Sequence, residues 1–341
     1  MTRVADVVAL LEPDRSGAGL VCGDGDATVE HVLLAVDAVP ATVAEAVRLG
    51  ADMLVAMESA VTADLGYRLG TAGIALCVVP SSDRDECSEA VAERLGLVDA
   101  RPLAPRDEAL DTVVAFVPKP DAERVIDALA EAGAGAIGDY ARCVWTAEGV
   151  GSFVPLDGAR PVVGAIGEVE SVAETRVEMV LPRARRAEVT AALSRAHPYE
   201  EPAFYLCELA ARPGRDGFGR VGDLAGPVPL ALFAAQVAER LRGRPGGVRA
   251  AGNPDRPVRR VAVVADAGAA DGLLALAANA DVLVTDDVPA HVPGAADGPA
   301  LVCAGTWATR RPRLDAVASR LRPLVRVTVS DAVTDPWSLH V

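Results

Sequence analysis

Two distant segments of this chain share one pattern, in which an apolar run leads into an acidic residue. One such segment spans 31–59 and the other spans 260–287; their first apolar runs reach Asp37 and Asp266, respectively. In each segment an Ala-rich stretch follows, and a second apolar run opens 15 residues after the first acid, on Asp52 or Asp281. Short apolar runs that flank a helix are typical of parallel strands buried on both faces. The pattern predicts two similar α/β lobes related by an internal repeat.

The stretch between these segments has a different pattern. Strand-like runs over 112–118 and 175–182 each end in proline and precede helical patterns over about 121–132 and 183–196. Proline is favourable at the first position of a helix, because the N–H that it lacks would have no partner there. Further strands are expected after each helix, near 142–146 and 203–209. Two β-α-β halves of this size predict a ferredoxin-like α+β domain.

Stretches rich in proline, glycine and charge separate these parts, as linkers usually do. They lie near 101–108 and 211–216. We therefore expect an α/β protein in which a smaller domain is inserted into a larger, bilobed one. The predicted boundaries are 1–107 for the first lobe, 108–212 for the insertion and 213–341 for the second lobe.

Charge and composition exclude several classes of partner. The formal net charge is −15, which opposes binding to a nucleic-acid backbone. No apolar stretch reaches the 18 residues needed to cross a bilayer, and the N-terminus does not have the pattern of a signal peptide. We expect a cytoplasmic protein with reduced cysteines, and neither a nucleic-acid partner nor a membrane.

Metal-binding side chains are scarce and dispersed. No two of the four histidines are two, three or four residues apart, and the six cysteines contain no C-x-x-C pair. A single helix or strand therefore offers no local pair of nitrogen or sulfur ligands. The four histidines are His31, His197, His291 and His340.

Several motifs resemble one known family. GAIGDY spans 135–140, HPYEEP spans 197–202 and GFGRVGDL spans 217–224, and a VTDPW sequence begins at Val333. In this order they resemble the Nif-three-like proteins, which are widely labelled GTP cyclohydrolase type 2 homologues. The resemblance is to the long bacterial form, whose inserted domain is similar to the PII and divalent-cation-tolerance proteins. It implies a ring-like homohexamer with a dinuclear metal centre between the two lobes.

The ligand motifs of that centre differ in this chain. Where the family has His-His-Pro after a strand of the first lobe, this sequence has Met57 and Glu58, followed by serine. Where the family has Gly-His-x-Ala-Thr-Glu, the histidine is replaced by Thr306 and the glutamate by Arg310. Each lost imidazole removes a nitrogen ligand, and the permanently charged guanidinium repels a dication. We therefore expect no metal cofactor.

Each acidic residue near this position has two interpretations. Asp37 ends a predicted parallel strand, where α/β folds bind ligands, but it could equally be the N-cap of the next helix. Glu58 could form a salt bridge with Arg310. Alternatively, Glu58 could hold a hard ion such as Mg²⁺ together with Asp83 or Asp85, one of which stands where the family has a third metal-binding acid.

Two further polar groups are candidates. His197, Tyr199 and Glu200 belong to the HPYEEP motif, whose prolines fix the backbone, so a structural or oligomer contact is as plausible as ligand binding. Asp286, Asp287 and His291 form a short polar cluster, for which a solvated loop is the better explanation.

Three functions remain open, and the sequence does not decide whether the protein is an enzyme. The first is a ring-forming, non-catalytic binding or regulatory protein. The second is a metal-independent enzyme that acts on a small anionic molecule in the cleft between the lobes. The third is a metal-dependent hydrolase that uses replacement carboxylates. The catalytic candidates are Asp37, Glu58 and Arg310; the ligand-binding candidates are Asp83, Asp85, Thr306, His197, Tyr199 and Glu200.

Overall fold

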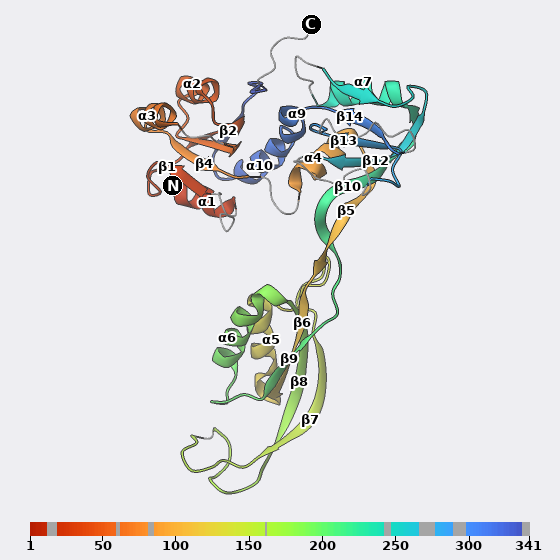
Figure 1. Cartoon of the computed structure of the whole chain (residues 1–341). Helices are drawn as coiled ribbons and strands as arrows, with labels where there is room; N and C mark the ends of the chain where they lie inside the picture. The colour runs from red at the N-terminus through yellow and green to blue at the C-terminus, as the bar shows by residue number, and fades with distance from the viewer. Residues whose placement is uncertain are drawn as a thin grey trace. The chain divides into compact units, whose positions relative to one another are not determined.

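The computed structural model describes residues 1–11, 19–58, 62–80, 85–160, 162–241, 247–265, 277–288 and 298–335. The chain separates into two compact units (Figure 1). One unit combines residues 1–106 with 215–341, and the other consists of residues 107–214. Each unit is described by itself below.

The first sheet of the larger unit has the strand order β1-β4-β3-β2-β15. Strands β2, β3, β4 and β15 are parallel, and β1 is antiparallel to β4. The C-terminal strand β15 pairs with β2, so this sheet joins segments from both ends of the chain. The strands are β1 (Gly19–Cys22), β2 (His31–Asp37), β3 (Met53–Glu58), β4 (Ala75–Val78) and β15 (Arg326–Val329).

Successive side chains of β2 point to opposite faces of this sheet and pack into two separate hydrophobic clusters. Leu33 and Ala35 pack with helices α2 (Pro40–Leu49) and α3 (Ala63–Ala72) on one face. Val32, Leu34 and Val36 face the other way, into the core shared with helix α1 (Val4–Leu10) and the second lobe. Strand β2 is therefore buried on both faces, as its continuous apolar run predicts.

The second sheet has the order β11-β14-β13-β12-β10-β5, with β12, β13 and β14 parallel. Helix α4 packs against β12 and also contacts α7, α9 and α10. A helix predicted after Asp266 lies outside the described residues. The strands are β5 (Val98–Glu108), β10 (Arg212–Pro229), β11 (Arg249–Ala251), β12 (Pro257–Val264), β13 (Val282–Thr285) and β14 (Ala300–Cys303); the helices are α4 (Glu86–Leu95), α7 (Leu230–Arg240), α9 (Thr306–Arg310) and α10 (Arg313–Leu321).

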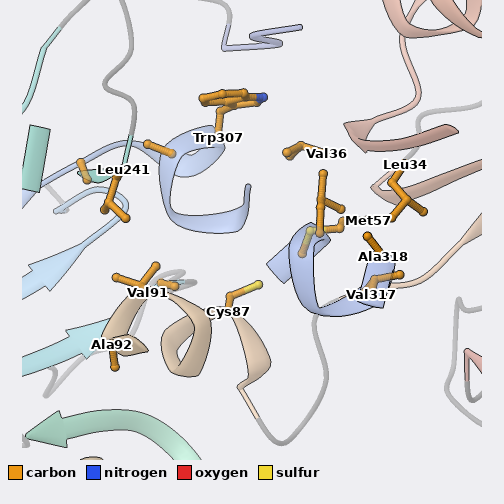
Figure 2. Close-up of a cluster of buried hydrophobic side chains, with 14 of the residues drawn as sticks. Leu34, Val36, Met57, Cys87, Val91, Ala92, Leu241, Trp307, Val317 and Ala318 are labelled. Carbon is orange, nitrogen blue, oxygen red and sulfur yellow. The ribbon is translucent and has the colours of Figure 1, made fainter. Parts of the chain in front are cut away.

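One hydrophobic core joins the two sheets. It contains Val91 from α4 and Trp307 from α9, beside Met57 from β3 and Val317 and Ala318 from α10 (Figure 2). Helices α4, α9 and α10 thus fix the position of one lobe against the other by apolar packing.

Asp52 and Asp281 make matching hydrogen bonds in the two lobes. The Asp52 carboxylate accepts the N–H groups of Glu30 and His31 (2.8 and 2.9 Å). The Asp281 carboxylate accepts those of Arg259 and Arg260 (2.9 and 2.8 Å). Each acid therefore ties the start of one central strand to the start of its parallel neighbour.

The smaller unit is a four-stranded antiparallel sheet of order β7-β8-β6-β9 with two helices. Most helix and strand predictions for this region are confirmed within a few residues, but the strand expected near 142–146 spans Trp145–Phe153 and the strand expected from 175 begins at Glu170. Another difference is a short 3₁₀ turn before each helix, which follows the proline that ends the strand. The elements are β6 (Leu110–Pro118), α5 (Ala122–Glu131), β7 (Trp145–Phe153), β8 (Glu170–Pro182), α6 (Arg186–Ala196) and β9 (Phe204–Glu208).

Candidate functional site

Two acidic residues lie side by side at the carboxyl ends of β2 and β3. The strands are parallel, and their register places Asp37 directly opposite Glu58. The N–H of Ala38 donates to the backbone oxygen of Glu58 at 3.0 Å, which extends the pairing past the strand end. This is the edge of a parallel sheet at which α/β folds usually place ligands.

Arg310 brings a positive charge from the second lobe to this edge. It lies on the short helix α9 and is 7% exposed. Its Nη1 atom lies 2.6 Å from Oε1 of Glu58, whose side chain is 56% exposed. The structure therefore contains the predicted salt bridge between Glu58 and Arg310, the two residues at positions where the resemblance implies metal ligands.

The Asp37 carboxylate does not cap helix α2. The N-cap is Val39, whose N–H donates to the hydroxyl oxygen of Thr42 (3.0 Å), while the Thr42 hydroxyl donates to the backbone oxygen of Asp37 (2.8 Å). The alternative prediction of an N-cap is therefore wrong, because Thr42 supplies the cap from inside the helix. The Asp37 carboxylate instead accepts a hydrogen bond from the hydroxyl of Thr334.

Burial raises the pKa of Asp37 above its usual value of 3.8. The hydrogen bond from Thr334 opposes this shift, the Glu58 carboxylate adds to it, and the Arg310 guanidinium lowers the pKa again. Asp37 thus ionises less readily than an exposed aspartate, although a cation is nearby.

Residues close to the C-terminus cover the same strand end. The N–H of Ser330 donates to the backbone oxygen of Leu34 (2.8 Å), and the Ser330 hydroxyl donates to Glu45 on α2 (2.5 Å). The indole N–H of Trp307 donates to the backbone oxygen of Ala332 (3.1 Å). Sequence reasoning did not identify this segment as part of the site, although the motif starting at Val333 was a signal for it.

The other two replacement residues do not join the ion pair. Met57 is 2% exposed and packs in the core beside Val36 (Figure 2), whereas Glu58, the next residue of β3, is exposed. Thr306 is exposed at the first turn of α9. Strand alternation explains the first placement, because consecutive residues of β3 point to opposite faces.

Asp85 has a structural position at the start of α4. One carboxylate oxygen accepts the N–H of Ser88 at 3.1 Å as the N-cap, and the other accepts the N–H of Gly219 at 2.6 Å. Asp85 is 7% exposed, so these backbone donors satisfy a buried charge. Its interaction with the GFGRVGDL segment of β10 was not predicted. The alternative acid, Asp83, lies outside the described residues.

The candidate residues of the HPYEEP motif lie in the smaller unit. His197 is buried; its Nε2 donates to the backbone oxygen of Phe116 (3.0 Å) and its Nδ1 accepts the N–H of Tyr199 (3.1 Å). Burial lowers the pKa of His197 below 6.5, which favours the neutral ring. Glu200 is exposed.

The described residues at the lobe interface form no cluster of metal ligands. In the described part of the chain, no three histidine, cysteine or acidic side chains are grouped so that they could hold a metal ion. Asp287 pairs with Arg249 (2.8 Å), and His291 lies outside the described residues. At about 4 Å and an effective dielectric near 20, a guanidinium and a dication repel by roughly 8 kcal/mol, twice the value for two unit charges.

No helix within the described ranges is long and apolar enough to cross a membrane.

The profile of the Duf34/NIF3 (NGG1p interacting factor 3) family matches residues 7–57 and 81–336. A Mycobacterium tuberculosis protein named "GTP cyclohydrolase 1 type 2 homolog" is 41% identical over 369 residues, covering 99% of this chain and 97% of that protein.

Solved structures agree with this match. A Bacillus cereus protein related to NIF3 has a TM-score of 0.83 at 30% identity, and a Staphylococcus aureus protein has a TM-score of 0.73 at 21% identity; 98% of each chain is covered in both comparisons. On the family profile and the full-length relative, this chain belongs to the Duf34/NIF3 family.

Proposed function

We propose that this chain is a family member whose inter-lobe site works without the dinuclear metal centre, and that it is a ring-forming binding or regulatory protein. The observation that carries the proposal is the Arg310–Glu58 ion pair, with 2.6 Å between Nη1 and Oε1. A buried guanidinium stands where the family resemblance implies a metal-binding glutamate. The neighbouring carboxylate compensates this cation and is therefore less available to a metal.

Hydrogen bonding of the remaining acids also supports the proposal. Asp85 uses both oxygens on backbone N–H groups, and Asp37 accepts a bond from Thr334. A hydrolase that used replacement carboxylates would have to give up these interactions. This makes the metal-dependent alternative the least favoured of the three.

One observation favours a second function, a metal-independent site for a small anion. Arg310 lies near Asp37, whose pKa is raised, so the guanidinium could hold a carboxylate or phosphate with less opposition from that carboxyl group. Glu58 would first have to leave Arg310. We rank this function second because the bridge competes with the anion.

We also propose that the chain consists of two repeated α/β lobes and an inserted ferredoxin-like domain. The matching bonds of Asp52 and Asp281 support an internal repeat of two α/β lobes. The strand order β7-β8-β6-β9 is that expected of a ferredoxin-like domain inserted between the lobes. We further propose a homohexamer in the cytoplasm, without a nucleic-acid partner, as the resemblance and the acidic charge suggest.

Metal titration of a restored site tests the proposal. Isothermal titration with Mn²⁺ and Zn²⁺ is compared between the wild-type chain and a variant carrying Glu58→His, Thr306→His and Arg310→Glu. We expect no saturable binding at the wild-type inter-lobe site and measurable binding by the variant. The control is Arg68→Glu, which reverses an exposed charge paired with Asp64. Wild-type binding that is abolished by Glu58→Gln would overturn the proposal.

A further inference from the structure

The smaller unit contains a cavity that the inter-lobe site does not involve. Its volume is about 880 Å³, and all of its lining residues belong to this unit. Strand β7, the connection from β7 to β8, and the HPYEEP segment surround it. A space of this size is within the range of small-molecule sites in proteins.

Tyr199 of the HPYEEP motif lines this cavity with a fixed ring. Its ring packs edge-on against His197 (centroids 5.1 Å apart) and Phe153 (5.7 Å). Its N–H donates to the His197 ring, which is itself tied to the backbone of Phe116. These contacts fix the direction of the phenol group.

The Tyr199 hydroxyl is buried and forms no hydrogen bond of ordinary geometry with the described residues. Buried tyrosine hydroxyls normally find a partner. Burial raises the pKa of Tyr199, and the nearby Glu174 carboxylate raises it further. The hydroxyl therefore remains protonated, and it lies beside the Glu174 carboxylate, which also lines the cavity.

Glycine gives the Glu174 carboxylate its place beside β7. A Cβ atom added to Gly151 would lie 2.1 Å from Oε2 of Glu174, so any larger residue would displace this carboxylate. Glu174 itself belongs to the neighbouring strand β8 and is partly buried. The cavity thus has a negative charge held close to a wall of aromatic rings.

The charge of the lining selects the kind of ligand. Five carboxylates and two guanidinium groups line the cavity. One carboxylate, Glu148, pairs with Lys119 at 2.5 Å, and the guanidinium of Arg176 pairs with Glu178 at 2.8 Å. A negative excess remains, and it opposes phosphates and carboxylates. Aromatic rings beside a carboxylate attract cations instead.

We propose that this cavity binds a small molecule that carries a protonated amine on an aromatic body, with Glu174 holding the amine, Phe116 and Phe153 contacting the body, and the Tyr199 hydroxyl bonding a polar atom. The site is independent of the function proposed for the lobes.

Two indole probes of opposite charge test the charge preference on the full-length chain. Saturation-transfer NMR and isothermal titration compare tryptamine, a cation, with indole-3-propionate, an anion. We expect tryptamine to bind at least about fivefold more tightly, and Glu174→Gln to remove most of that preference. Glu188→Gln on α6, which lies outside the cavity lining, is the matched control and should change neither affinity.

A second variant separates ligand contact from folding. Tyr199→Phe keeps the ring packing and removes only the buried hydroxyl beside Glu174, so its melting temperature should stay close to that of wild type while tryptamine affinity falls. Equal binding of the two probes, a preference unchanged in Glu174→Gln, or no saturation transfer from either probe would overturn the proposal.

Discussion

The Glu58–Arg310 ion pair should contribute measurably to stability, because one of its partners is buried. Separated by 2.6 Å, two unit charges attract by about 6 kcal/mol at an effective dielectric of 20. Desolvation of the guanidinium and the exposure of Glu58, 56% at its side chain, offset much of this attraction. We expect a net coupling free energy of about 1–2 kcal/mol, which lies above the range of exposed pairs.

A double-mutant cycle measures this coupling. Glu58→Gln, Arg310→Met and the combined variant are unfolded in urea, and the coupling is the non-additive part of the change in unfolding free energy. The Arg68–Asp64 pair is a matched control: its atoms are 2.9 Å apart and both side chains are more than half exposed. Its coupling should be about 0.3–0.5 kcal/mol.

Two results of this double-mutant cycle would refute the expected coupling. If the Glu58–Arg310 coupling does not exceed that of the surface control, the bridge is not a structural replacement for a metal centre. A coupling that disappears in 0.5 M NaCl would lead to the same conclusion, since salt screens exposed pairs much more than buried ones.

Three further predictions concern single residues. Asp37→Asn should stabilise the folded protein at pH values above the raised pKa of Asp37, because burial makes the ionised wild-type carboxylate unfavourable in the folded state. Below pH 3.8 the wild-type group is protonated in both the folded and the unfolded chain, so the gain should vanish. Urea unfolding across this pH range measures the difference in unfolding free energy. Asp85→Ala should lower the unfolding free energy by about 2–3 kcal/mol, because it removes the α4 cap and the hydrogen bond from Gly219. Asp85→Asn should cost less, since asparagine tolerates the positive φ of this position. Thermal unfolding compares the two variants. The pKa of His197 is lowered in the folded state, so the unfolding free energy should decrease as the pH falls through 6.5 and the unfolded chain takes up a proton more readily. An NMR titration of the His197 ring with a midpoint at or above 6.5 would contradict this.

Local sequence patterns predicted the local structure well. The apolar runs ending at Asp37 and Glu58 became neighbouring parallel strands, and the strand–proline–helix pattern appeared in the smaller unit. Both follow from short-range rules, since strand burial and helix initiation depend on neighbouring residues. The Glu58–Arg310 bridge was predicted only because the resemblance assigned both positions to one ligand set.

Long-range partners could not be predicted in the same way. Strand β15 pairs with β2 across nearly the whole chain, and Thr334 donates to Asp37 in the same region. Nothing in the local composition of either segment specifies these pairs. For the same reason Asp85 was considered as a ligand, although its carboxylate is occupied by the backbone of Ser88 and Gly219.

Metal content tests the central claim most directly. Untagged protein is purified without chelator and measured by inductively coupled plasma mass spectrometry, before and after soaking in Mn²⁺, Zn²⁺ and Fe²⁺. The Glu58–Arg310 bridge predicts well below one ion per chain in every sample. One or two ions per chain, lost in Glu58→Gln but retained in Arg68→Glu, would contradict the account and return the chain to the metal-dependent hydrolases.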